Sequence, residues 1–197
     1  EEDLTPRGVA TADVNGDGND DVLIGNTSAL TDGDLPTTVT VYFGGDDFPT
    51  EPAILRNSTG YAASLTAGDF DGDGLMDIAS EAAGTGFSVH YNEGNETFSE
   101  AASFGFSNSF QQILAADFDQ DGLADIVGMG LTGGASVALA EEGRDFAGPT
   151  AFESSLLPPP QAFIDVGDLD GNGGPDIATN VHGGEVWVLW NDGNAEF

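Results

Sequence analysis

Four short acidic segments recur along this 197-residue chain at a nearly constant interval. A second pattern repeats with the same period: an alternating apolar segment follows each cluster and ends in a glycine turn and a phenylalanine, at Phe48, Phe98, Phe146 and Phe197. The clusters are DVNGDGNDD (13–21), DFDGDGLMD (69–77), DFDQDGLAD (117–125) and DLDGNGGPD (168–176), and their first aspartates are 56, 48 and 51 residues apart. Two patterns that share one period of about 50 residues indicate a repeat protein.

Each repeat has the sequence pattern of short β-strands. One apolar stretch leads into the acidic cluster, a second leaves it, and a third alternates with period two before the phenylalanine. A weaker fourth stretch follows the first three phenylalanines, in PAILR, AASFGF and PTAFES. No long stripe of helical period is present, so we expect few helices. The pattern predicts an all-β fold, a β-propeller of four-stranded antiparallel blades, with a sandwich or a solenoid as alternatives.

We expect a single domain over residues 1–197. Its repeats are approximately 1–56, 57–106, 107–156 and 157–197. The last repeat lacks a fourth strand, and three arrangements remain open: residues 1–6 close a four-blade ring, the repeats are a segment of a larger propeller, or the open edge pairs with another copy. The opening EEDLTP is not a signal peptide, and we interpret it as a mature start or an excerpt of a longer chain.

The acidic clusters have the spacing of a calcium-binding loop. Calcium takes six to eight oxygen ligands, and acids at loop positions 1, 3 and 5 direct three side chains into one concavity. Glycine at position 6 permits a sharp turn, while a main-chain carbonyl at position 7 and an acid at position 9 complete the protein ligands. We therefore expect about four Ca²⁺ ions, one per loop. The candidate ligands are Asp13, Asn15, Asp17, Asn19 and Asp21; Asp69, Asp71, Asp73, Leu75 and Asp77; Asp117, Asp119, Asp121, Leu123 and Asp125; and Asp168, Asp170, Asn172, Gly174 and Asp176.

An EF-hand is the main competing interpretation of the clusters, and the sequence argues against it. An EF-hand needs a glutamate at position 12 and helices on both sides, but that position holds Ile24, Ser80, Gly128 or Thr179, and the flanks are predicted strands. A solvated acidic turn accounts for one cluster but not for four at one period. Magnesium is disfavoured because it keeps several waters. Neutral oxygens replace carboxylates at Asn15 and Asn172, so we predict weaker binding in the first and fourth loops.

The four loops and the alternating hairpins that end in phenylalanine resemble the FG-GAP/VCBS repeat family, which includes the calcium-binding blades of integrin α-subunit propellers. The resemblance covers nearly the whole chain. It implies that each loop joins the first two strands of a blade and holds one Ca²⁺. The chain departs from the family in two ways: typical members close seven blades where four repeats are seen, and FGG at 43–45 is only a partial match to the Phe-Gly motif.

The charge of the chain excludes several partners. With 35 acidic residues against 3 arginines and no lysine, the net charge of −32 repels nucleic acid and anionic membranes. No apolar run is long enough for membrane insertion. The 14 acids at candidate ligand positions leave 21 others, so the excess also resembles proteins of halophilic microbes. The absence of cysteine excludes disulfides and thiol chemistry.

Few residues suggest catalysis. His90 and His182 lie in different repeats without a nucleophile pattern, and Trp187 and Trp190, expected on opposite faces of a strand, are better explained by core packing or the open edge. We therefore expect a non-enzymatic extracellular or cell-surface module that binds a protein or glycan, or self-assembles through its open edge. The sequons at Asn26, Asn57 and Asn95 agree with a surface glycoprotein. The alternative is the propeller of a polysaccharide-active enzyme.

Overall fold

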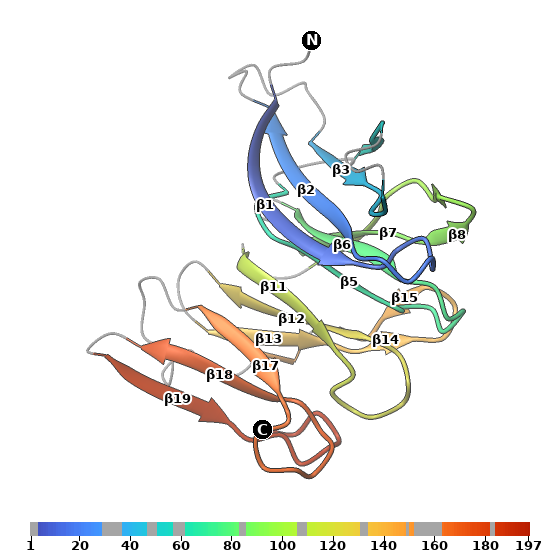
Figure 1. Ribbon diagram of the computed structural model, residues 1–197. Coiled ribbons are helices and arrows are strands. Elements are labelled where there is room, and N and C mark those ends of the chain that lie inside the picture. Colours follow the sequence, from blue (N-terminus) through green and yellow to red (C-terminus); the bar gives the residue numbers. More distant parts are fainter. Residues whose placement is uncertain are drawn as a thin grey trace.

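The computed structural model describes residues 4–28, 37–46, 51–56, 62–82, 86–105, 110–130, 134–148, 150–151, 163–181 and 184–197. All regular structure in these ranges is β, as expected, and they contain no helix long and apolar enough to cross a membrane. Within these ranges, four antiparallel sheets of three or four strands follow one another along the chain (Figure 1). Phe48, Asn57 and His182 lie outside the described residues.

The sheets share one strand order, in which each strand pairs with the next strand of its own sheet. Sheet 1 consists of β1 (Leu4–Ala12), β2 (Asp21–Ser28), β3 (Thr38–Tyr42) and β4 (Ala53–Arg56). Sheet 2 consists of β5 (Leu65–Gly68), β6 (Asp77–Ala82), β7 (Gly86–His90) and β10 (Ala102–Gly105). Sheet 3 consists of β11 (Phe110–Ala116), β12 (Asp125–Gly130), β13 (Ala135–Ala138) and β16 (Thr150–Ala151). Sheet 4 has three strands in the described residues, β17 (Ile164–Gly167), β18 (Asp176–Val181) and β19 (Glu185–Leu189).

Small hairpins project beyond the third strands of sheets 2 and 3. They are β8 (Asn92–Gly94) with β9 (Thr97–Phe98), and β14 (Ala140–Glu141) with β15 (Asp145–Phe146). The fourth strands expected after the first three phenylalanines are confirmed as β4, β10 and β16.

Adjacent sheets pack face to face, and each boundary holds one apolar cluster. Leu23, Val39 and Ile78 belong to the cluster between sheets 1 and 2. Phe87 and Ile113 belong to that between sheets 2 and 3, and sheets 3 and 4 enclose a third cluster. A backbone contact helps to set the distance between sheets 1 and 2, because a Cβ on Gly25 would overlap the carbonyl oxygen of Ala62.

The first strands of the sheets are neighbours: β1 lies against β5, β5 against β11, and β11 against β17. The sheets thus fan out from these strands into an arc with β1 and β17 at opposite ends (Figure 1). The described residues form no closed ring.

The periodic phenylalanines that the structure describes pack against the preceding sheet. Phe146 of β15 lies edge-on to Phe87 of sheet 2 with the ring centroids 4.9 Å apart. The ring centroid of Phe197 lies 5.8 Å from that of Phe118, at the start of the third acidic loop. Phe98 joins the cluster between sheets 1 and 2. The second periodic pattern in the sequence therefore marks contacts between repeats.

Candidate metal centres

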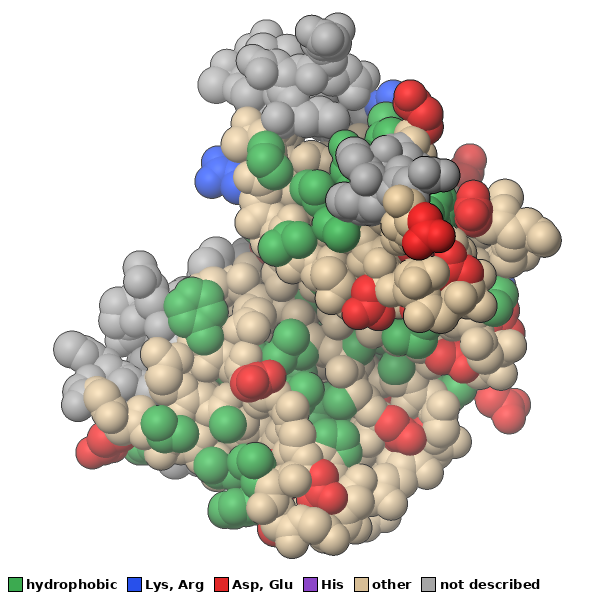
Figure 2. Space-filling model, in the orientation of Figure 1, with side chains coloured by type: hydrophobic (Ala, Val, Ile, Leu, Met, Phe, Trp, Pro, Cys, Tyr) green, Lys and Arg blue, Asp and Glu red, His purple; other side chains and the backbone are tan. Residues whose placement is uncertain are grey.

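The four acidic loops occupy one place in the architecture. They connect β1 to β2, β5 to β6, β11 to β12, and β17 to β18, the first two strands of each sheet. Strands rather than helices flank every loop, which confirms that none is an EF-hand. All four lie along one edge of the arc (Figure 1), and acidic side chains gather on that edge of the surface (Figure 2).

The backbone of each loop wraps around the aspartate at position 1. In the second loop, Asp69 accepts hydrogen bonds from the N–H groups of Gly72 at 2.8 Å and Gly74 at 2.9 Å. The position-6 glycine donates to the same aspartate in the other three loops, at 2.8 to 3.0 Å. These glycines have φ between 85° and 96°, the left-handed region that favours glycine. The sharp turn expected at position 6 is therefore present in all four loops.

In three loops, the folded chain brings the carboxylates of positions 1, 3 and 9 together. One oxygen from each residue lies within 4.8 Å of the others. The triads are Asp69, Asp71 and Asp77; Asp117, Asp119 and Asp125; and Asp168, Asp170 and Asp176. Three converging hard oxygens from negative groups suit a divalent cation such as Ca²⁺ and leave room for further oxygen ligands. The donor set thus fits the metal expected from the sequence.

The position-5 side chains are not members of these triads. Asp73 accepts the N–H of Leu75, and Asp121 that of Leu123, both at 2.8 Å. In the fourth loop Asn172 accepts the N–H of Gly174 at 2.7 Å in the same way. Metal ligation by the position-5 side chains and by the position-7 carbonyls stays a prediction.

The first loop has the same backbone form but a different donor set. Asp13 accepts the N–H of Gly16 at 2.7 Å and that of Gly18 at 2.8 Å. Asn15 holds the third position, so an amide oxygen replaces one carboxylate of the triad. Of the two substitutions noted in the sequence, Asn15 therefore changes the triad, whereas Asn172 lies beside it.

The aspartate at position 9 has a structural role that the sequence did not reveal. Asp21, Asp77, Asp125 and Asp176 are all fully buried. One oxygen of each accepts the N–H of loop position 2, and the other accepts an N–H just beyond the third strand, at 2.7 to 2.9 Å. This carboxylate therefore joins the acidic loop to the third strand of its own sheet, besides its place among the candidate ligands.

Burial changes the proton affinity of these acids. It raises the pKa of Asp77 and of Asp125 to about 7, against the lowering effect of two backbone N–H donors on each. Burial also raises the pKa of Asp119. The backbone N–H of Asn19 holds the pKa of Asp17 below its ordinary value. Without a cation, the buried members of the second and third triads therefore take up protons more readily than an exposed aspartate, so calcium binding competes with protonation.

Each of the first three loops also accepts a hydrogen bond from a residue of the repeat that follows it. Asn92 of β8 in the second repeat donates to the carbonyl oxygen of Val14 in the first loop at 2.6 Å. Asn191 donates to that of Phe118 in the third loop at 2.8 Å. At the second loop, Arg144 donates to Asp71 at 2.7 Å. These three residues were not singled out from the sequence; comparison of the repeats at the position after the third strand would have found the two asparagines.

Several other candidate groups are placed less favourably for function. His90 is buried and its Nδ1 lies 3.0 Å from the carbonyl oxygen of Ser99, and burial lowers its pKa. The expectation that Asn26 is an exposed sequon is wrong, because it lies in β2, is 6% exposed and donates to Thr40 at 2.9 Å. Asn95 is exposed in the hairpin between β8 and β9. Trp187 packs on the core between sheets 3 and 4, whereas Trp190 is 54% exposed.

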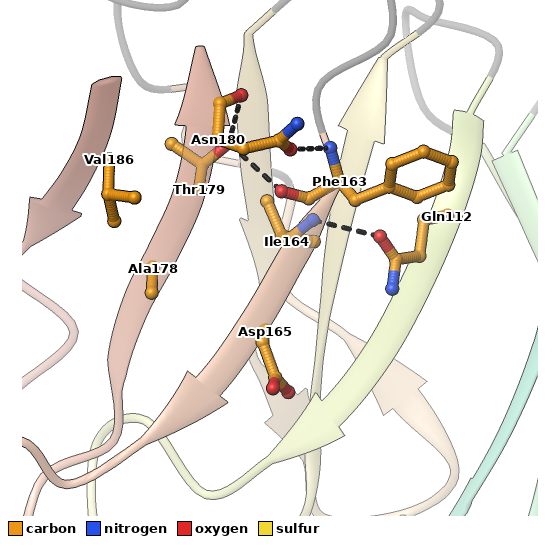
Figure 3. Close-up of a pocket in the computed structure, with 8 residues that line it drawn as sticks. All are labelled: Gln112, Phe163, Ile164, Asp165, Ala178, Thr179, Asn180 and Val186. Carbon is orange, nitrogen blue, oxygen red and sulfur yellow. Dashed lines mark hydrogen bonds between the residues drawn. The ribbon is translucent and has the colours of Figure 1, made fainter. Parts of the chain in front are cut away.

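A groove of about 500 Å³ lies where sheet 4 meets β11 (Figure 3). It is lined by Gln112, Phe163, Ile164, Asp165, Ala178, Thr179, Asn180 and Val186. Its polar groups bond to one another: Gln112 accepts the N–H of Ile164 at 2.9 Å, and Asn180 accepts that of Phe163 at 2.7 Å. The groove is therefore mainly part of the contact between sheets 3 and 4.

Comparison with known families identifies one matching region. Residues 13–80 match the model of the FG-GAP-like repeat, a stretch that begins at the first aspartate of the first loop and contains the whole of the second. No curated protein matches the chain. The chain therefore contains an FG-GAP-like repeat at residues 13–80, together with acidic clusters suited to calcium.

Proposed function

We propose that this protein is a calcium-stabilised module of β-propeller blades that serves as a non-enzymatic binding or assembly unit outside the cell. The observation that carries the proposal is the position of the triads. Three equivalent carboxylate triads lie at the same connection of three successive sheets, and each of the first three loops accepts a hydrogen bond from the next repeat. Cation binding there would stabilise the contacts between sheets as well as each loop.

Calcium would act by relieving charge repulsion. The carboxylates of one triad repel one another at short range, and a divalent cation turns that repulsion into attraction. All candidate ligands named from the sequence, including the position-5 side chains and the position-7 carbonyls, belong to this proposal. Binding to the folded state alone adds about 2.7 kcal/mol per site when calcium is at a hundredfold excess over its Kd. Four such sites would dominate the stability of a chain of this size.

The sheets support the propeller part of the proposal. They are four-stranded and antiparallel where complete, they fan out from adjacent first strands, and their number equals that of the sequence repeats. We propose that residues 1–197 form one domain of such blades, either as part of a larger propeller or completed by another strand. Four blades are the lower limit of the usual propeller range.

An edge of sheet 4 supports the assembly part. β19 pairs with β18 on one side, and within the described residues it has no counterpart of β4, β10 or β16 on the other. Val186 on this strand is 71% exposed. An unpaired edge accepts an additional strand through main-chain hydrogen bonds, so a protein partner or a second copy is the expected ligand of this edge. A glycan bound by the exposed loops is the other ligand that we propose.

Extracellular calcium is abundant enough to fill loops of this kind, whose affinities lie at about 10⁻⁴–10⁻³ M in extracellular modules. We therefore propose a secreted or surface location, a halophilic source for so acidic a chain, and no nucleic-acid partner or membrane insertion. The propeller of a polysaccharide-active enzyme is the alternative, and a catalytic domain in the same gene would favour it.

Two measurements in calcium and in chelator test this function. Thermal unfolding tests the stabilisation by calcium, and size-exclusion chromatography with light scattering tests self-assembly. We expect calcium to raise the melting temperature by more than about 10 °C, since about 2.7 kcal/mol per site is worth several degrees in a protein of this length. Equal melting temperatures in calcium, magnesium and chelator would refute the calcium module. Retention of one monomeric mass at high concentration would refute self-assembly.

A further inference from the structure

We propose that Arg144 is a built-in competitor of calcium at the second loop, and that Glu93 sets how strongly it competes. The inference rests on the calcium binding proposed above. It concerns one arginine in a chain whose net charge is −32. The consequence is that two loops with the same four acids have different calcium affinities.

The contacts of Arg144 reach from one repeat to the preceding one. The residue lies in the turn between β14 and β15, and this hairpin lies beside the second loop (Figure 1). Its Nε donates to Asp71 Oδ2 at 2.7 Å, and its Nη1 donates to Glu93 Oε1 at 2.6 Å. Its guanidinium carbon lies 4.6 Å from the ring centroid of Tyr91. Three contacts with the preceding repeat therefore hold the guanidinium against the loop.

Asp71 is a member of the triad, so it is one of the three groups that would contact calcium directly. Its side chain is 7% exposed, whereas that of Arg144 is 37% exposed. A charged pair with one buried partner is less screened by water and salt than an exposed pair. The positive charge beside Asp71 therefore lowers the negative potential that attracts a divalent ion, and it repels the bound ion.

Two effects of Arg144 oppose each other. Fixing Asp71 in place reduces the ordering that calcium binding requires, which favours binding. Repulsion between a guanidinium and a divalent ion disfavours it, and its strength grows with the ion's double charge. The backbone of the second loop already orders its side chains, since Asp71 also accepts the N–H of Asp73 at 3.2 Å. Little ordering is left for Arg144 to supply, so repulsion is the larger effect.

Glu93 moderates the competition. Its carboxylate neutralises part of the guanidinium charge and is 47% exposed, outside the triad. Removing the glutamate leaves Arg144 uncompensated beside Asp71, whereas removing the arginine leaves an additional acid near the loop. The two substitutions must therefore change calcium affinity in opposite directions, which a purely structural role of the ion pair does not predict.

The third loop is a matched control within the same chain. It has aspartates at positions 1, 3, 5 and 9 like the second loop, and its triad has the same members. Among the described residues, Asp119 has no arginine partner. The residue equivalent to Arg144 in the following repeat is Ala195, which carries no charge and whose N–H donates to the carbonyl oxygen of Phe118 at 3.1 Å. Any difference between the loops is therefore expected to come largely from Arg144.

Calcium titration followed by two-dimensional NMR of the full chain resolves the two sites. The N–H of Gly74 donates to Asp69 and that of Gly122 to Asp117, so each amide reports its own loop. In the unsubstituted protein we expect Gly74 to shift at a calcium concentration about tenfold higher than Gly122, the size of effect that one nearby charge has on a divalent ion in partly exposed surroundings. Arg144→Gln should bring the Gly74 midpoint down to that of Gly122, and Glu93→Gln should raise it further. The Gly122 midpoint should stay unchanged in both variants.

Arg144→Lys separates charge from folding. It keeps a positive charge and should leave the Gly74 midpoint close to that of the unsubstituted protein, even if the fork of hydrogen bonds is lost. Equal midpoints for Gly74 and Gly122 in the unsubstituted protein, or an upward shift of Gly74 in Arg144→Gln, would overturn the competitor role while leaving calcium binding intact. If no glycine responds to calcium, the proposed function fails and this inference fails with it. Should Arg144→Gln not fold, the upward shift in Glu93→Gln still decides the question.

Discussion

Replacement of Asp125 by asparagine tests whether the position-9 aspartate is a structural acceptor as well as a ligand. Asp125 is fully buried, and its two oxygens accept the N–H groups of Phe118 at 2.7 Å and Ala140 at 2.8 Å. Asparagine has nearly the same shape but offers one oxygen and one amino group. One of the two backbone donors would then face another donor.

The expected loss follows from these two bonds. A hydrogen bond to a charged acceptor contributes about 1.5–3 kcal/mol, and a buried N–H left without a partner costs about 1–3 kcal/mol. Removal of a buried charge offsets part of this, because burial already raises the pKa of Asp125 to about 7. We expect a net loss of about 3 kcal/mol in the free energy of unfolding, or about 6–12 °C in melting temperature for a chain of this length.

The assay is urea unfolding at about pH 8, above the raised pKa of Asp125, in chelator and in calcium, with Asp121→Asn as the matched control. Asp121 lies in the same loop at position 5 and accepts the N–H of Leu123 at 2.8 Å. An asparagine keeps that bond, as Asn172 does in the fourth loop. In chelator, Asp121→Asn should change stability by less than about 0.5 kcal/mol. In calcium, both variants should gain less free energy of unfolding from the metal than the unsubstituted protein does.

Equal stability of Asp125→Asn and the unsubstituted protein in chelator would refute the reasoning. The position-9 aspartate would then serve the metal alone, and its two backbone bonds would have no net energetic value. A loss of similar size in both variants would show instead that any charge removed from this loop is costly.

Three further predictions concern the wider set of loops. Asp77 and Asp125 have pKa values of about 7 in the folded chain against 3.8 ordinarily, so in chelator the free energy of unfolding should fall as the pH rises from 3.8 through 7. Over the same range the stabilisation by calcium should grow. Thermal melts across this range in chelator and in calcium test both trends, and a free energy of unfolding that rises with pH in chelator would contradict the prediction. Asn92→Ala and Asn191→Ala should each cost about 2–4 kcal/mol in urea unfolding, since each removes donors to two carbonyl oxygens, whereas Asn194→Ala in an exposed turn should cost little. Asn15→Asp should complete an acidic triad and tighten calcium binding at the first loop. In an NMR titration, the calcium midpoint of the Gly18 amide should fall while that of Gly122 serves as reference. An unchanged Gly18 midpoint would show that the amide oxygen ligates as well as a carboxylate.

The local character of each repeat could be predicted from the sequence because it depends on residues close together in the chain. Alternation with period two, glycine turns and the phenylalanine register identified the strands, including β4, β10 and β16. The spacing of the acids within nine residues identified the candidate ligands of each loop, and in the second loop the folded chain brings three of them, Asp69, Asp71 and Asp77, together. Turn geometry and short-range hydrogen bonds are enough to form these features.

Relations between repeats depended on the tertiary structure. The sequence did not indicate that Arg144 pairs with Asp71, 73 residues earlier, or that Asn92 reaches Val14 across 78 residues. It also suggested an exposed sequon at Asn26, which the third strand of sheet 1 covers.

The sequence by itself determined the repeat, the strands and the acidic loops, because short-range geometry specifies them. Only the tertiary structure decided which aspartates converge, which also hold the backbone, and which neighbouring repeat bonds to each loop. Those outcomes depend on how whole sheets pack, and packing distances between sheets are set by side chains that lie far apart along the chain.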